Sequence, residues 1–127
     1  MRELGRHLIL EFFECDPRVL NDMKLLENML LKAAEKAEVK VVGKAFHKFA
    51  PQGVTGIIIV AESHFSIHTW PEYGYAAIDI FTCGNTAKPE KAYEEIEKVL
   101  KPKRVSMTEM KRGIIEVAEE IKVVRRA

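Results

Sequence analysis

Residues 54–83 read VTGIIIVAESHFSIHTWPEYGYAAIDIFTC, and this stretch decides the fold. Val54–Ala61 is almost wholly apolar and rich in β-branched side chains, which is typical of a central strand. His64–Trp70 and Tyr75–Phe81 also have strand character, and Pro71–Gly74 between them has the composition of a tight turn. The stretch therefore predicts a central strand followed by a β-hairpin.

Two amphipathic helices are predicted, one on each side of this stretch. Asp16 and Pro17 open the first helix. Aspartate accepts hydrogen bonds from free backbone N–H groups, and the N–H group that proline lacks has no partner within the helix at the first helical position. Pro89 opens the second helix, and Pro102 ends it. The apolar positions of the first helix recur at three- and four-residue spacing: Val19, Met23, Leu26, Leu30, Ala33 and Ala37.

Further strands are predicted at residues 4–13, 39–45 and 104–110, so the element order is β-α-β-β-β-β-α-β. The simplest packing for this order is an α+β fold, a two-layer α/β sandwich with two helices on one face of a mostly antiparallel sheet. The length of 127 residues predicts a single domain. Residues 111–127 could form a last strand or a tail. In the strand at residues 39–45, apolar and small side chains alternate with others: Val39, Val41, Gly43 and Ala45.

The composition argues against several classes of protein. Lys and Arg number 20 against 19 Asp and Glu, and this balance is not that of a nucleic-acid-binding or basic membrane-binding chain. No apolar run reaches about 18 residues, so no membrane-spanning helix is expected. The first residues lack the long apolar segment of a signal peptide. The two cysteines, Cys15 and Cys83, are therefore interpreted as reduced thiols of a cytoplasmic protein.

Reactive side chains gather in the predicted hairpin and just before it. A hairpin that places Trp70 opposite Tyr75 also brings Ser63 beside Thr82 and Cys83, when both strands are counted back from the turn. His68 lies five residues along the same strand from Ser63, which is about 16 Å at roughly 3.3 Å per residue. Ser63 and His68 can act on one another only if the strand bends or if the histidine comes from another subunit.

The run ESHFSIHTWPEYGYAAIDIFTCG, from Glu62 to Gly84, resembles the signature of the prokaryotic S-adenosylmethionine decarboxylases, the small pyruvoyl-dependent type. LGRH at residues 4–7 and FHKF at residues 46–49 are also similar to the pattern of this family. The resemblance extends from residue 4 to around residue 105 and adds nothing for the last 20 residues.

The resemblance implies a proenzyme that cuts itself between Glu62 and Ser63, giving a chain of residues 1–62 and a chain of residues 63–127. Ser63 then becomes a pyruvoyl group at the new N-terminus. This keto group forms a Schiff base with the substrate amine and takes up the electron pair released with carbon dioxide. No metal is needed for this chemistry.

The resemblance also implies roles for three further side chains. His68 is the proton acceptor in processing, since the pKa of imidazole lies near neutral pH. Cys83 is the proton donor in catalysis, since a thiol with a pKa of about 8.5 is mostly protonated at neutral pH. A hydroxyl at position 55 assists processing in relatives. The residue here is Thr55 where serine is expected, and threonine keeps the hydroxyl but restricts its rotamer.

The implied substrate is S-adenosyl-L-methionine, a cation with an adenine ring. Its product, S-adenosylmethioninamine, is the aminopropyl donor for spermidine in polyamine biosynthesis. Phe49 and Trp70 are candidates for stacking on adenine or facing the sulfonium, and Glu72 is a candidate for the ribose hydroxyls. The sites of the family form at the interface of a two-fold homodimer, so His68 and Thr55 of one subunit would serve the cleavage site of the other.

Other interpretations remain open from the sequence alone. Some pyruvoyl-dependent arginine decarboxylases look like the same family, and a relative that does not cleave itself could act as a binding or regulatory subunit. His64 and His68 have the i,i+4 spacing of a helical metal pair, but their β-branched and aromatic neighbours favour a strand, so a metal site is not expected. His7 and His47 are interpreted as structural.

Overall fold

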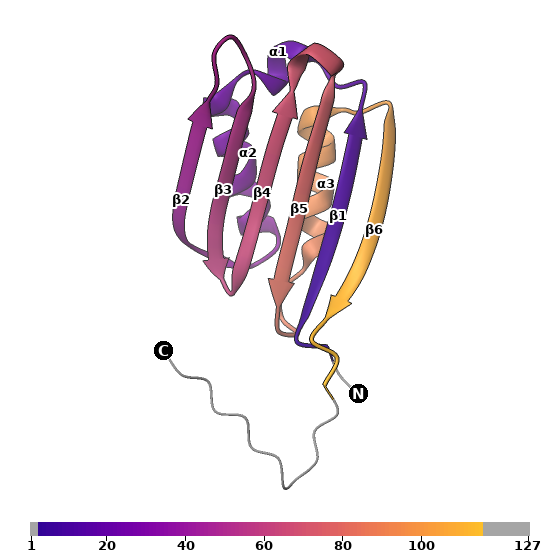
Figure 1. Ribbon diagram of the computed structural model, residues 1–127. Helices are drawn as coiled ribbons and strands as arrows, with labels where there is room; N and C mark the ends of the chain where they lie inside the picture. Colours follow the sequence, from indigo (N-terminus) through magenta and orange to yellow (C-terminus); the bar gives the residue numbers. More distant parts are fainter. Residues whose placement is uncertain (1–2, 116–127) are drawn as a thin grey trace, which may run out of the picture.

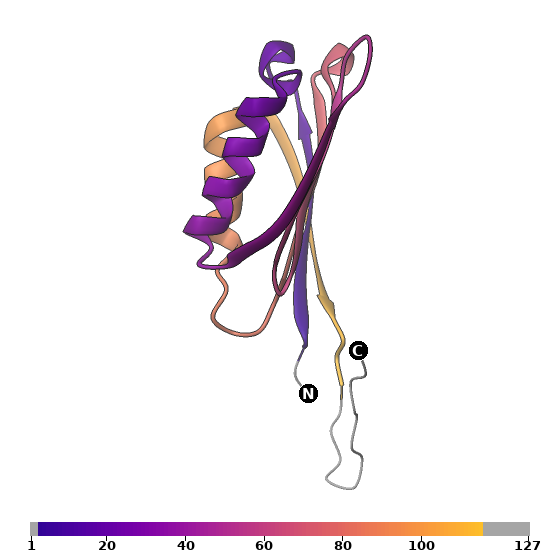
Figure 2. The same cartoon turned by 90° about the vertical axis from the view of Figure 1, so that its left-hand side faces the viewer.

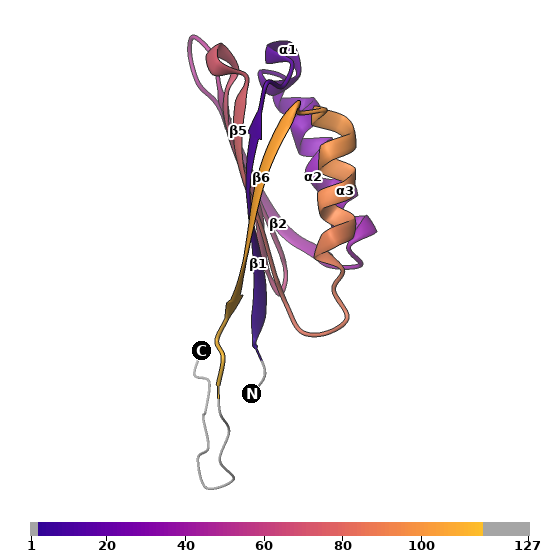
Figure 3. The ribbon, with the colours of Figure 1, turned by 90° about the vertical axis from the view of Figure 1, so that its right-hand side faces the viewer.

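The structure is a computed structural model that describes residues 3–115. It contains one six-stranded sheet with the order β2-β3-β4-β5-β1-β6, in which all neighbours pair antiparallel (Figure 1). The helices cover a single face of this sheet (Figures 2 and 3). The predicted α+β two-layer sandwich is therefore confirmed. The strands are β1 (Gly5–Phe13), β2 (Lys40–Lys48), β3 (Val54–Ala61), β4 (Ser63–Trp70), β5 (Tyr75–Cys83) and β6 (Arg104–Arg112).

The helical layer differs from the prediction in one respect. The single helix predicted after Asp16 is wrong, because the chain turns at Asn21 and begins a second helix. Asp16 accepts a hydrogen bond from the backbone N–H of Arg18 at 2.9 Å, and Asp22 accepts one from Leu25 at 3.1 Å. Each carboxylate thus satisfies an N–H group that a first helical turn leaves free. The helices are α1 (Pro17–Leu20), α2 (Met23–Lys36) and α3 (Pro89–Leu100), of which α2 and α3 form the layer.

The hydrophobic core fills the space between α2, α3 and the sheet. Alternate residues of the central strands point into it, as expected for a sheet with one covered face. Fully burying one such Leu, Ile or Phe side chain contributes roughly 1.5–3 kcal/mol, so this layer supplies much of the stability. The largest fully buried side chains are Leu10, Phe12, Leu20, Leu26, Leu30, Ile58, Phe65, Ile67, Ile78, Ile80, Ile96 and Leu100.

Strand β2 does not keep the alternation that the sequence predicts. A β-bulge lies between Val41 and Gly43, so that Val41 pairs with Val60 whereas Gly43 pairs with Ile59. One extra residue at a bulge moves the following side chains to the opposite face of the strand. Gly43 therefore does not share a face with Val41. Strand β6 runs to Arg112, beyond the predicted end, and residues 116–127 of the predicted tail lie outside the described residues.

The second face of the sheet, called the open face from here on, has no helix of residues 3–115 over it (Figures 2 and 3). Most of its side chains are half-buried or exposed, and many are polar or aromatic. Thr55 of β3, His68 of β4 and Asp79 of β5 are among them. The reactive side chains predicted from the sequence therefore lie mainly on the open face, away from the helices.

Candidate active site

Ser63 lies at the sharp reversal between β3 and β4, where Glu62 is the single connecting residue. The hairpin pairs Trp70 with Tyr75 and Ser63 with Thr82, as the sequence predicts. The Oγ atom of Ser63 lies 2.9 Å from the Sγ atom of Cys83. A hydroxyl and a thiol from two different strands are therefore in direct contact at this end of the sheet.

The backbone of Ser63 is strained. Its φ angle is 115°, in a region that L side chains rarely adopt, and such a residue costs about 1–3 kcal/mol. The strain sits at the residue that follows the predicted cleavage point.

Thr55 and His68 form a second contact, on the neighbouring strand pair. The two residues lie directly opposite one another in β3 and β4. The Oγ1 atom of Thr55 lies 3.0 Å from the Nδ1 atom of His68. The imidazole is half-buried. This contact involves its Nδ1 atom, so the Nε2 atom is the ring nitrogen that can exchange a proton with another group.

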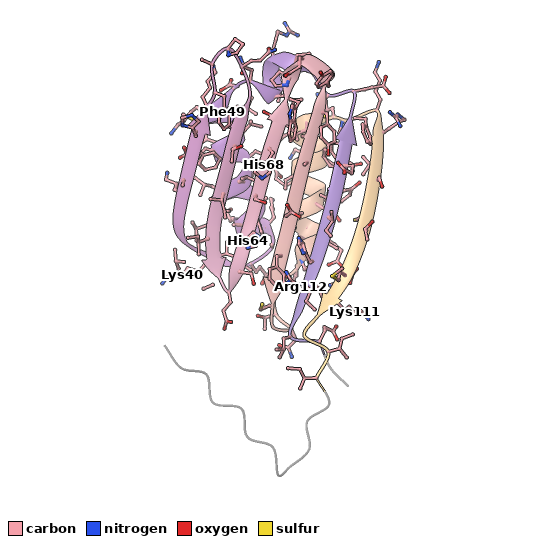
Figure 4. The ribbon with its side chains drawn as sticks, in the orientation of Figure 1. Lys40, Phe49, His64, His68, Lys111 and Arg112 are labelled. Atoms are coloured by element: carbon pink, nitrogen blue, oxygen red, sulfur yellow. The ribbon has the colours of Figure 1, made fainter. Side chains whose placement is uncertain are left out.

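The two contacts do not meet within one chain. Strand β4 keeps an unbroken antiparallel register with β5 from Ser63 to Trp70, so it does not fold back on itself. The separation of Ser63 and His68 along the strand is therefore about 16 Å. Figure 4 shows His68 well up β4, with His64 between it and the lower end of the strand. We call the pairs Ser63–Cys83 and Thr55–His68 the two half-sites.

Comparisons with known proteins identify the family. The family model described as S-adenosylmethionine decarboxylase matches residues 6–113. The chain is 51% identical over 113 residues to the S-adenosylmethionine decarboxylase proenzyme of Thermotoga maritima, covering 89% of this chain and 87% of the relative. It is 49% identical over 119 residues to the proenzyme of the same name from Methanococcus maripaludis, covering 94% and 98%. The chain belongs to the S-adenosylmethionine decarboxylase family.

A solved structure supports the same assignment for this decarboxylase family member. The crystal structure of the adenosylmethionine decarboxylase from Aquifex aeolicus superposes with a TM-score of 0.87 and 33% sequence identity, covering 97% of this chain and 100% of that one. The resemblance predicted from residues 62–84 is therefore confirmed across nearly the whole chain. No helix within residues 3–115 is long and apolar enough to cross a membrane.

The three predicted substrate-binding residues of this decarboxylase lie at the His68 end of the sheet. Trp70 ends β4, is 40% exposed, and has its ring centroid 5.2 Å from that of Tyr75. Phe49 follows β2 and is 48% exposed, and Glu72 is exposed in the short 3-10 helix at residues 71–73. They lie near the half-site that holds the histidine, and the whole length of β4 separates them from Ser63.

One polar cluster was not predicted from the sequence. Asp79 lies 2.8 Å from the Nε2 atom of His7 and accepts a hydrogen bond from the hydroxyl of Ser66 at 3.2 Å. The cluster occupies the middle of the open face, between the two half-sites. Asp79 is the single charged residue of β5, and this feature of the sequence could have predicted a polar cluster at its position. Burial, opposed by the charge of Asp79, lowers the pKa of the neighbouring His64, which favours its neutral form.

The two thiols have different environments. Burial raises the pKa of Cys15 to about 11, so this thiol is inert in the core. Cys83 is only half-buried and contacts Ser63, so it is the thiol that can take part in chemistry. Within residues 3–115 no group of three or more His, Cys, Asp or Glu side chains is arranged to hold a metal ion.

Proposed function

We propose that this chain cuts itself between Glu62 and Ser63 and then decarboxylates S-adenosyl-L-methionine. The family match and the proenzyme names of the relatives support the activity. The observation that carries the assignment to particular residues is the contact between Ser63 Oγ and Cys83 Sγ at a strained reversal. The products of the cut are residues 1–62 and residues 63–127, and the decarboxylated product feeds spermidine synthesis.

Processing begins at Ser63. Its hydroxyl attacks the carbonyl carbon of Glu62, so the amide becomes an ester and the nitrogen of Ser63 becomes a free amine. A base then removes the α-proton of Ser63, and Glu62 leaves as a carboxylate. Water replaces the nitrogen of the remaining dehydroalanine, which releases ammonia and leaves a pyruvoyl group. The strain at Ser63 favours the first step, because the rearrangement frees the residue from its φ of 115°.

His68 is the base that we assign to this step. An imidazole accepts a proton only at a nitrogen that carries no hydrogen. If Nδ1 carries the hydrogen and donates it to Thr55 Oγ1, then Nε2 has the free electron pair that a base requires. Thr55 can accept that hydrogen bond, and the branching of its side chain limits the rotamers in which its hydroxyl does so.

A homodimer is needed to bring the half-sites together. His68 is about 16 Å from Ser63 of its own chain, too far for proton transfer, so the His68 that acts belongs to a second copy. The open face is the surface through which two copies can exchange these residues, since no helix of residues 3–115 covers it. The same exchange brings Phe49, Trp70 and Glu72 of one copy towards Ser63 of the other.

In the mature enzyme, the pyruvoyl group at position 63 supplies a keto carbon that condenses with the substrate amine and withdraws the electrons released with carbon dioxide. Cys83, which contacts residue 63, returns a proton to the α-carbon of the substrate. Trp70 and Phe49 offer exposed aromatic faces for the adenine ring and the sulfonium, and the carboxylate of Glu72 accepts hydrogen bonds from the ribose hydroxyls.

The test is the intact mass of freshly purified protein under denaturing conditions, followed by an assay of carbon dioxide release. We expect two chains that meet at residues 62 and 63, with the chain that starts at residue 63 blocked to N-terminal sequencing. We expect carbon dioxide from S-adenosyl-L-methionine and none from arginine. A single chain that stays uncut on long incubation, or release from arginine alone, would show that the proposed function is wrong.

A further inference from the structure

The LGRH motif at residues 4–7 has one residue that the proposed mechanism does not use. Gly5 begins β1 and lies directly opposite Cys83 in β5. It is buried, although it has no side chain to pack. The space that a side chain would take at this position is already filled by groups of β5.

The distances around Gly5 are unusually short. A Cβ atom at position 5 would lie 2.7 Å from Cε1 of Phe81, 3.0 Å from the carbonyl oxygen of Thr82 and 3.2 Å from Sγ of Cys83. The 2.7 Å separation from Phe81 is one that packed carbon atoms do not show, and the other two are shorter than most contacts of a Cβ atom, so each neighbour would have to move. A side chain at position 5 would therefore press on the ring of Phe81 and on the thiol of Cys83.

The three neighbours are not equally free to move. The ring of Phe81 contacts the rings of His7 at 5.3 Å and His64 at 5.7 Å, and the guanidinium of Arg112 lies 4.8 Å from its centre. The carbonyl of Thr82 belongs to the backbone of the sheet. The thiol of Cys83 can move by rotation about one side-chain bond, so it is the group that an added methyl group displaces.

We propose that Gly5 is a positioning residue for Cys83: by carrying no side chain on the β1 side of the thiol, it sets how the thiol lies against residue 63 on the β4 side. The proposal rests on the proposed role of Cys83 as the proton donor. It assigns to the glycine of the LGRH motif a part in the turnover step and none in the cut, since Gly5 contacts the thiol and neither His68 nor the bond between Glu62 and Ser63 is among its close neighbours.

Gly5→Ala tests the proposal, and Gly43→Ala is a matched control. Gly43 is also a strand glycine on the open face, but a Cβ atom there would meet only Ile59, at 3.4 Å or more. We expect Gly5→Ala to cut itself at close to the wild-type rate while kcat for carbon dioxide release falls about ten- to a hundredfold with little change in KM. Gly43→Ala should match the wild type in both measurements.

A second measurement does not depend on activity. In the uncleaved Ser63→Ala chain, the rate at which iodoacetamide alkylates Cys83, followed by peptide mass, reports where the thiol lies. Adding Gly5→Ala should change this rate about threefold or more, because the methyl group displaces the thiol away from β1, and adding Gly43→Ala should leave the rate unchanged. An unchanged alkylation rate together with an unchanged kcat would overturn the proposal.

If Gly5→Ala folds poorly, Gly5→Ala/Phe81→Leu makes room by removing the atom at 2.7 Å and leaves the contact with the thiol in place. Compared with Phe81→Leu alone, the double variant should recover thermal stability while the loss of kcat remains. Full recovery of kcat would show that Phe81, and not the thiol, is what Gly5 accommodates. If the wild type neither cuts itself nor releases carbon dioxide, the proposed function fails, and the alkylation of the Ser63→Ala chains still decides the role of Gly5.

Discussion

The two half-sites are built on the same strand in opposite ways. Ser63, at the start of β4, has a strained backbone and contacts β5 through the thiol of Cys83. His68, five residues later, sits in an unbroken ladder and is bonded to Thr55 of β3. The residue proposed to break its own backbone is held under strain, whereas the residue proposed to accept a proton lies in regular strand structure. The strand that carries both also keeps them apart, so the proposed chemistry requires a second copy.

The largest expected effect comes from separating the half-sites onto different chains. Neither a Ser63→Ala chain nor a His68→Ala chain should cut itself alone. When the two are co-expressed, dimers that contain one of each should cut the His68→Ala chain, because it keeps Ser63 and receives a base from its partner. Intact mass of the co-purified dimers measures this outcome. If mixed dimers remain uncut, the exchange between subunits is wrong and the strand must bend within one chain.

The next effect separates the two functions within the first half-site. Cys83→Ala should leave the cut at residues 62 and 63 largely intact, because the thiol is not the base for that step. Decarboxylation should fall by about 10²–10⁴-fold, the usual contribution of a positioned proton donor. Single-turnover kinetics after complete processing measures the second value. A variant that stays uncut would mean that the contact with Ser63 serves cleavage instead.

A smaller effect is expected in the second half-site. Thr55→Val keeps the shape of the side chain and removes the oxygen that contacts His68 Nδ1. One such bond contributes roughly 1 kcal/mol, so the rate of cleavage should fall about five- to tenfold. Thr55→Ser should cut itself at the wild-type rate or faster. Cleavage is timed by mass after synthesis in a cell-free system, and equal rates for the Val and Ser variants would remove Thr55 from the mechanism.

The strain in the first half-site can be measured as stability. Ser63→Gly and Ser63→Ala both abolish the cut, so their intact chains can be compared by urea unfolding. Glycine adopts a φ of 115° without strain, whereas alanine keeps the strain, so the glycine variant should be more stable by about 1–2 kcal/mol. The same pair at Ser66, made in the uncleaved Ser63→Ala chain, should show the reverse order, because Ser66 lies in regular β4 and glycine weakens an ordinary strand.

Local pattern was sufficient to predict one part of this molecule. The turn composition of Pro71–Gly74, which places Trp70 opposite Tyr75, fixes the hairpin register and hence the meeting of Ser63 with Cys83. The break at Asn21 could not be predicted, because the apolar spacing continues from Leu20 to Met23 through it. The bond between His7 and Asp79 joins residues 72 positions apart, and it depends on β1 inserting between β5 and β6. The tight space at Gly5 depends on the same insertion.

The smallest effect concerns the residue beside Gly5. Arg6 donates from Nε to Glu109 of β6 at 2.9 Å and also pairs with Glu90 of α3, so it ties the first half-site to the edge strand and the helical layer. These hydrogen bonds hold the pKa of each carboxyl below its usual range. A carboxyl with a lowered folded-state pKa contributes stability above its unfolded pKa of about 4.3 and loses that contribution as the pH falls through the folded value.

Arg6→Gln should therefore lower the free energy of unfolding at pH 7 by less than about 1 kcal/mol, since both carboxylates are partly exposed and screened by solvent. The difference from the wild type should shrink as the pH falls towards 3, where the carboxyls are protonated in either chain. Urea unfolding of uncleaved Ser63→Ala chains at several pH values measures it, with Lys32→Gln in α2 as a control for the loss of one positive charge. A difference that stays constant with pH would mean that Arg6 stabilises this end of the sheet by packing and not by charge.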